Sequence, residues 1–157
     1  MRSTILCLTL IVGVAACENS TDPFIGFGGS GGTITQAQAT GNWSFTVHPQ
    51  SGCASGSLAD NQVLTAHLDV AADGTVNSST SFWQVSSPFV TGAVSGAVDL
   101  PNGRPTLSLG ASAGTAMELT GIMTAAGTFS GTLGDPDPGF FFVFAVCTYT
   151  TTGTKTG

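Results

Sequence analysis

Residues 41–48 read GNWSFTVH, with a large apolar side chain at every second position. Successive side chains of a β-strand point to opposite faces, so this alternation places Trp43, Phe45 and Val47 together on one face. The residues between them are polar or small. The stretch therefore predicts a β-strand with one buried and one solvent-facing side.

The same period of two recurs along the rest of the chain, and no stretch offers the 3.6-residue apolar stripe of a helix. Turn residues separate the alternating segments, for example PNG at 101–103 and DPDPG at 135–139. The predicted strands are 41–48, 62–72, 74–85, 89–100, 104–112, 114–123, 127–134 and 139–151.

Short connections make consecutive strands neighbours in an antiparallel sheet. Eight such strands leave no unpaired edge when the first pairs with the last, so the chain is predicted to be all-β and to form an up-and-down barrel. The alternative is a β-sandwich of the same strands. The large side chains expected to face inward are Trp43, Phe45, Val47, Ala66, Leu68, Val70, Val90, Val94, Val98, Leu107, Leu109, Met117, Leu119, Met123, Phe129 and Leu133.

Glycines fall on inward positions of the predicted barrel, at Gly92, Gly96, Gly121 and Gly131. Each removes a side chain from the interior, so either large rings fill the space or a ligand cavity remains. The second reading predicts a narrow apolar pocket. Its candidate ligand-binding residues are Trp43, Trp83, Phe89, Gly92, Gly96 and Phe129.

The N-terminal segment has the features of a signal peptide. Arg2 precedes an apolar run from Ile5 to Ala16, shorter than the ~20 residues that a spanning helix needs. Residues 14–17, VAAC, resemble the lipobox of bacterial lipoproteins. The resemblance implies that residues 1–16 are removed and that Cys17 carries the acyl chains of a membrane anchor. The alternative is a secreted protein whose Cys17 pairs with another thiol.

The resemblance also implies a location. The protein is expected in the cell envelope, on the extracytoplasmic side, and Glu18 after the cysteine favours the outer membrane or cell surface over the inner membrane. Residues 17–39 include the run GGSGG at 28–32, which has nothing to pack and predicts a flexible tether. Residues 40–157 then form the folded domain.

The first predicted strand carries a second resemblance. Gly41-Asn42-Trp43 is similar to the Gly-x-Trp opening of lipocalin and avidin barrels, in which the tryptophan plugs one end. The resemblance implies a small barrel of that kind. The polar residues that bind biotin in the avidins have no counterpart in this sequence, so the resemblance assigns no binding residue.

Two cysteines fall within the predicted domain, Cys53 and Cys147. Cys17 is assigned to lipid, and export leads to an oxidising compartment, so Cys53 and Cys147 are predicted to form a disulfide. The alternative is a pair of buried free thiols.

The composition argues against several functions. Lys and Arg number three against nine Asp and Glu, a net charge of −6, so no basic surface is available for nucleic acid. His48 and His67 lie on separate predicted strands and do not form a metal site, and no G-x-S-x-G nucleophile motif occurs. We therefore expect no enzymatic activity, no metal and no cofactor. The expected function is to bind or carry a small apolar molecule; the alternative is a structural or interaction lipoprotein of the envelope whose barrel is filled, with an envelope protein as partner.

Overall fold

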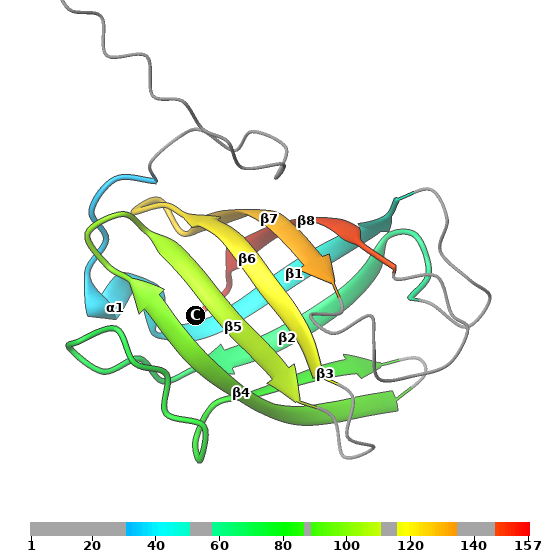
Figure 1. The fold of residues 1–157 in the computed structure, drawn as a ribbon, viewed down its shortest axis with the longest axis horizontal. Coiled ribbons are helices and arrows are strands. Elements are labelled where there is room, and N and C mark those ends of the chain that lie inside the picture. The colour runs from blue at the N-terminus through cyan, green and yellow to red at the C-terminus, as the bar shows by residue number, and fades with distance from the viewer. Residues whose placement is uncertain (1–30, 51–57, 87–88, 111–115, 135–146) are drawn as a thin grey trace, which may run out of the picture.

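A computed structural model describes residues 31–50, 58–86, 89–110, 116–134 and 147–157. Within them lie one short helix and eight strands that close into a barrel (Figure 1). The elements are α1 (Gln36–Ala39), β1 (Gly41–Pro49), β2 (Gln62–Leu68), β3 (Phe82–Ser86), β4 (Phe89–Asp99), β5 (Arg104–Gly110), β6 (Ala116–Met123), β7 (Thr128–Gly134) and β8 (Tyr149–Lys155).

Every strand pairs antiparallel with the strand that follows it, and β1 also pairs with β8. Phe45, for example, lies opposite Leu64 of β2 and opposite Gly153 of β8. Because β1 has partners on both sides, the sheet has no free edge. The predicted up-and-down barrel is therefore confirmed, and the β-sandwich is excluded.

The predicted inward face is the core of the barrel. Fourteen of the sixteen positions are buried; Val90 and Met117 are half-buried and pack against the core. Both lie near strand ends that flank residues outside the described ranges. The side chains between the inward ones are mostly Ser and Thr, so each strand meets solvent with short polar groups, as alternation predicts.

The helix α1 covers one end of the barrel. Thr35 and Gln38 form a capping box: Gln38 donates its backbone N–H to Thr35 Oγ1, and the Thr35 backbone N–H donates to Gln38 Oε1. Trp43 fixes the helix from inside, because its Nε1 donates to the carbonyl of Ala39 at 2.9 Å. Trp43 thus closes this end of the barrel.

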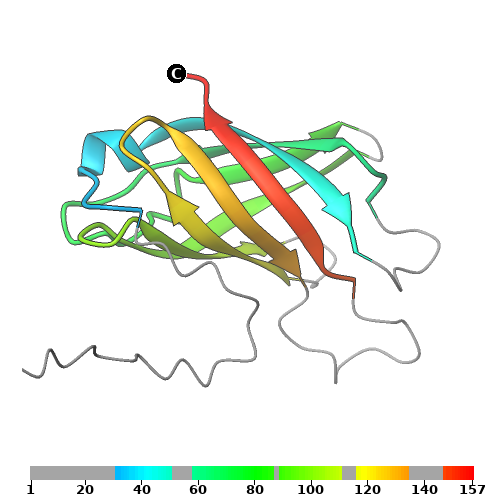
Figure 2. The same ribbon diagram turned by 90° about the horizontal axis from the view of Figure 1, so that it is seen from above.

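The opposite end carries the connections β1–β2, β3–β4, β5–β6 and β7–β8, as the antiparallel order requires (Figure 2). The segments outside the described residues at 51–57, 87–88, 111–115 and 135–146 belong to these connections. The barrel is therefore closed at the α1 end. At the other end, the structure describes the strands but not these parts of their connections.

The connection between β2 and β3 is longer than predicted. Residues 69–81, placed in two long strands, form a connection with only isolated bridges. The side chain of Asp69 accepts from Thr80 Oγ1 at 2.6 Å and Asn77 Nδ2 at 3.2 Å, which folds the segment back on itself. These polar side chains compete with the sheet ladder.

The last strand is also displaced. The prediction placed it at 139–151, guided by the phenylalanine-rich run, whereas β8 spans Tyr149–Lys155 and pairs with β7 and β1 through its threonines. The run at 139–146 lies outside the described residues. A threonine-rich strand satisfies the alternation as well, with Thr151 inward and Thr150 and Thr152 outward.

Packing onto the barrel begins before residue 40. Ile34 and Ala39 are buried, and the backbone N–H of Ile34 donates to Leu100 O at 2.9 Å. The predicted range of the tether, 17–39, therefore extends too far, because the chain is packed from Ile34 and helical at Gln36–Ala39. No helix in the described part of the chain has the length and apolar character to cross a membrane.

Candidate functional site

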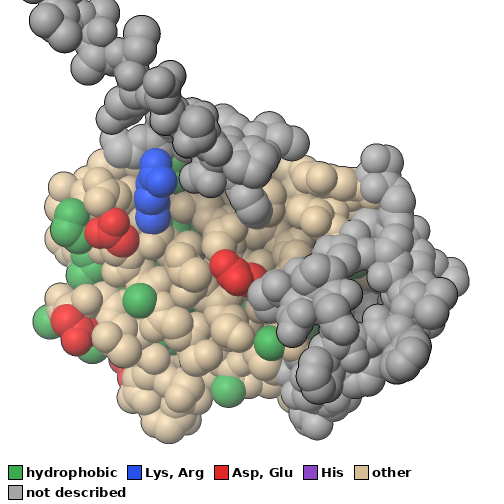
Figure 3. All heavy atoms as spheres, in the orientation of Figure 1, with side chains coloured by type: hydrophobic (Ala, Val, Ile, Leu, Met, Phe, Trp, Pro, Cys, Tyr) green, Lys and Arg blue, Asp and Glu red, His purple; other side chains and the backbone are tan. Residues whose placement is uncertain are grey.

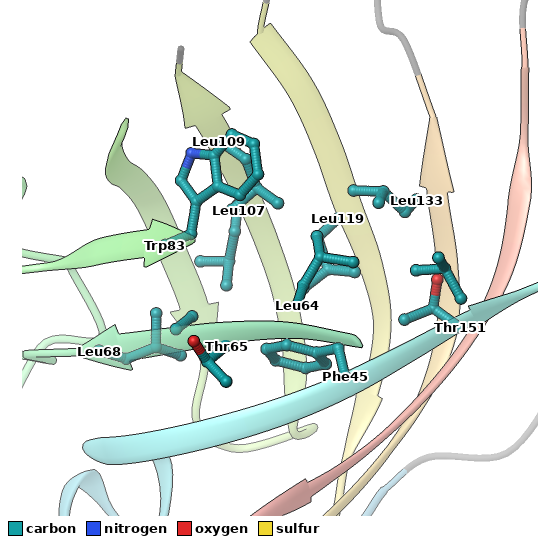
Figure 4. A pocket seen from close by; sticks show the side chains of 12 residues that line it. Phe45, Leu64, Thr65, Leu68, Trp83, Leu107, Leu109, Leu119, Leu133 and Thr151 are labelled. Carbon is teal, nitrogen blue, oxygen red and sulfur yellow. The ribbon is translucent and has the colours of Figure 1, made fainter. Parts of the chain in front are cut away.

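The interior of the barrel was the predicted binding site, and its own side chains fill it. The cavity between the strands has a volume of about 10 Å³, roughly the space of one water molecule (Figure 4). It is lined by Phe45, Val47, Leu64, Thr65, Ala66, Leu68, Trp83, Leu107, Leu109, Leu119, Leu133 and Thr151. Between the described residues that line it, this cavity has no room for an organic ligand.

Phenylalanine rings occupy the space left by the inward glycines. A Cβ on Gly121 or Gly131 would first meet a backbone oxygen, of Ser130 at 2.3 Å or of Thr120 at 2.1 Å. It would also come within 2.8 Å or 2.7 Å of Phe129 Cζ, so the ring of Phe129 lies over both glycines. Phe129 also packs edge-on against Phe45, with ring centroids 5.3 Å apart. Of the two readings of these glycines, large rings fill the space.

The other two inward glycines make room for backbone. A Cβ on Gly92 would lie 1.5 Å from the carbonyl oxygen of Gly110, the same oxygen to which Trp83 Nε1 donates at 2.8 Å. Gly96 has φ +119°, and its Cβ would meet Thr106 O at 2.2 Å. These glycines allow close strand approach and do not border the cavity.

The predicted ligand-binding residues are therefore not gathered around one space. Trp83 lines the cavity, whereas Trp43 lies at the closed end and Phe129 over the glycine pair. The backbone of Phe89 pairs with Ser86, and its side chain lies outside the description. Trp83 is the one member of the predicted set, as far as it is described, that borders the void.

Sequence reasoning missed a polar group in this interior. Thr151 is fully buried and lines the cavity, and its hydroxyl has no hydrogen-bond partner among the described residues. A buried hydroxyl without a partner costs free energy, so such a group calls for an explanation. Alternation along β8 places Thr151 inward, but this follows only once the strand is known to span Tyr149–Lys155.

The charged groups lie near strand ends and turns. His48 Nδ1 is 2.9 Å from Asp60 Oδ1, and Lys155 Nζ donates to Ala37 O at 2.6 Å. The backbone N–H of Thr75, assisted by its hydroxyl, bonds to Asp73 and lowers the pKa of that carboxyl. The stabilisation that accompanies a depressed carboxyl pKa is fully present above the pKa of the unfolded state and is lost as pH falls through the pKa of the folded state. The hydrogen bonds of Asp73 therefore stabilise this turn at neutral pH.

Metal-binding groups do not converge in the part of the chain that the structure describes. No three His, Cys, Asp or Glu side chains there could share an ion. His67 instead bonds through Nδ1 to Asn42 Oδ1 at 2.8 Å and stacks on Phe82. Both histidines therefore have partners other than a metal.

The cysteine predictions fall partly or wholly outside the description. Cys147 is half-buried and packs against the core, whereas Cys53 and Cys17 lie outside the described residues. The Cys53–Cys147 disulfide and the lipidation of Cys17 stay predictions.

Comparison of the chain with protein-family models, with curated proteins and with solved structures finds no match in any of the three.

Proposed function

We propose that this protein is a non-enzymatic lipoprotein of the cell envelope that acts as a structural or interaction module through the outer surface of a filled barrel. The observation that supports this function is the interior cavity of about 10 Å³. Pockets for small molecules commonly measure about 300–1,000 Å³, so the outer surface is the better candidate for contact with other molecules.

Lipidation of Cys17 would place the module at the membrane. Its support is the lipobox-like VAAC sequence at residues 14–17 and the glycine-rich run that follows. Acyl chains contribute about 0.8 kcal/mol per buried methylene, so several chains hold a domain at a bilayer. The tether lets the barrel reach away from that surface.

A variant at Cys17 tests the anchor. In a bacterial host we expect the wild-type chain to incorporate radiolabelled palmitate and to fractionate with membranes, and Cys17→Ala to lose the label. Globomycin, which blocks lipoprotein signal peptidase, should cause the unprocessed precursor to accumulate. A Cys17→Ala chain that still fractionates as wild type, or a wild-type chain without label, would refute the anchor.

A ligand search tests the filled barrel. We expect native mass spectrometry of the full chain, purified from membranes in detergent, to show only the protein and its covalent lipid. The physical reason is the lack of interior volume. A stoichiometric non-covalent mass that disappears in Thr151→Val would contradict the filled barrel.

That contradictory result would favour the second candidate function, a carrier of a small apolar molecule. The specific observation in its favour is the unpartnered hydroxyl of Thr151 in an otherwise apolar cavity lining. A ligand with one polar group would satisfy this hydroxyl, while its apolar part would replace core side chains that move aside. Thr152→Val, one residue along β8 and exposed, is the matched control.

A further inference from the structure

An aromatic pair stands on the outer surface of β2 and β3. Phe82 is 47% exposed, and its ring stacks on the imidazole of His67 with centroids 5.7 Å apart and an angle of 23° between the planes. A single exposed apolar side chain is common on soluble proteins. This one is held against a second ring in a paired register, because His67 lies opposite Phe82.

The imidazole is itself oriented. His67 Nδ1 lies 2.8 Å from Asn42 Oδ1, and Asn42 is opposite His67 in the β1–β2 register. The amide oxygen of Asn42 accepts from Nδ1, so this contact fixes the orientation of the imidazole and leaves Nε2 at the other edge of the ring. Asn42, His67 and Phe82 thus form a fixed row across three strands.

A second row of polar side chains runs beside the first. Ser44, Thr65, Gln84 and Thr91 occupy opposite positions on β1 to β4, two residues along each strand from the first row. Side chains two apart on one strand are separated by about 7 Å, and those on adjacent strands by about 5 Å. The side chains of Thr65 and Gln84 have no hydrogen-bond partner within the described residues.

Neither row contains Asp, Glu, Lys or Arg. The scarcity of charge extends to other parts of the surface: the face in Figure 3 is mostly uncharged, with a few isolated acidic and basic side chains. A partner recognised through charge, such as a phosphate-bearing polymer or an anionic bilayer, would find no complement in these rows. The rows instead combine an aromatic face with uncharged hydrogen-bonding groups.

We propose that these residues, the Phe82 strip (Asn42, His67, Phe82, Thr65 and Gln84), bind a neutral carbohydrate chain. The faces of sugar rings carry C–H groups that pack on the negative face of an aromatic ring, and their edges carry hydroxyls. Phe82 supplies the stacking surface, and His67 Nε2 supplies a hydrogen-bonding nitrogen. Gln84 and Thr65 supply donors and acceptors about 5 Å apart on neighbouring strands, a spacing close to the width of one sugar ring. The inference rests on the proposed function, since it names the partner class of that outer surface.

Polysaccharide pull-down with the full chain tests the strip. We use chitin, amorphous cellulose and starch granules as insoluble probes and measure the bound fraction against probe concentration. Wild type should be retained on at least one of them, with no loss between low and high salt because no charges take part. Phe82→Ser should weaken retention about tenfold by removing the stacking ring.

Val63→Ser is the matched control, because Val63 is the other exposed large hydrophobic among the described residues, at 44%, and lies on the same outer face. It should bind as wild type, and both variants should keep the wild-type melting temperature. Retention on none of the three probes, or equal retention of Phe82→Ser, would overturn the strip. So would Phe82-dependent binding to phosphatidylcholine vesicles in place of the polysaccharides, since that would identify a lipid surface.

The failure of this inference is separable from that of the proposed function. If the barrel contains no interior ligand and binds none of the three polysaccharides, the proposed function stands and only the Phe82 strip is refuted. A ligand inside the barrel would refute the filled interior, whatever Phe82→Ser does on its outer surface.

Discussion

Trp43→Ala is expected to lower the free energy of unfolding by about 3–5 kcal/mol, the range for removing a large buried aromatic side chain. Trp43 is 1% exposed, stacks on Phe45 with centroids 6.1 Å apart, and donates from Nε1 to the carbonyl of Ala39. The substitution leaves a cavity at the closed end and an acceptor of α1 without its donor. Urea unfolding followed by far-UV circular dichroism measures the loss.

Trp43→Phe separates the two contributions. A phenyl ring retains most of the apolar contact with Phe45 but has no N–H for Ala39, so an intermediate loss is expected. The difference in unfolding free energy between the two variants then measures the effect of the larger cavity in Trp43→Ala. The loss of unfolding free energy that remains in Trp43→Phe measures the hydrogen bond to Ala39 together with the smaller ring. A loss below about 1 kcal/mol in Trp43→Ala would mean that this end of the barrel is not packed as described.

The barrel fold was predictable because the alternation of apolar residues within a single strand already indicates which of its side chains are buried. Alternation in GNWSFTVH assigns Trp43, Phe45 and Val47 to one face without reference to any other strand, and all three are buried. Short turns then limit the order of the strands to a meander. Closure followed from the need to pair the first and last edges, so the barrel required no knowledge of individual contacts.

The state of the interior was not predictable in the same way. Alternation identifies Gly121 and Gly131 as inward but does not say which ring lies over them. That depends on register: Gly121 is opposite Gly131, so their missing side chains form one shared space, and Phe129 of β7 reaches into it. An inward glycine can therefore indicate a ring from a neighbouring position as easily as a cavity.

The Phe82 strip was missed for a related reason. Strand alternation directs Phe82 and His67 outward, but only the β2–β3 register places them side by side. Considered on its own strand, His67 is a single polar side chain between Ala66 and Leu68. A residue whose partner lies on another strand is recognised only when the pairing between the two strands is known.

The filled interior itself can be tested with Phe129→Ala, for which we again expect a loss of about 3–5 kcal/mol in the free energy of unfolding. Phe129 is 3% exposed, meets Phe45 edge-on and covers the glycine pair, so removal of its ring leaves a space bordered by Phe45 and two glycines. Neither glycine offers a Cβ toward that space. The variant should therefore contain an apolar cavity about the size of a benzene ring.

Such a cavity is expected to bind benzene, which enters dry apolar voids in protein interiors. Saturating benzene should raise the melting temperature of Phe129→Ala and leave that of the wild type unchanged, because binding to the folded state alone stabilises it. Phe82→Ala is the control: it removes the same ring from the outer surface, where 47% of the side chain is exposed, and should cost little stability and gain no response to benzene. If benzene stabilised the wild type as much as Phe129→Ala, the barrel would be hollow before the ring is removed. That result would favour the carrier function over the proposed interaction module.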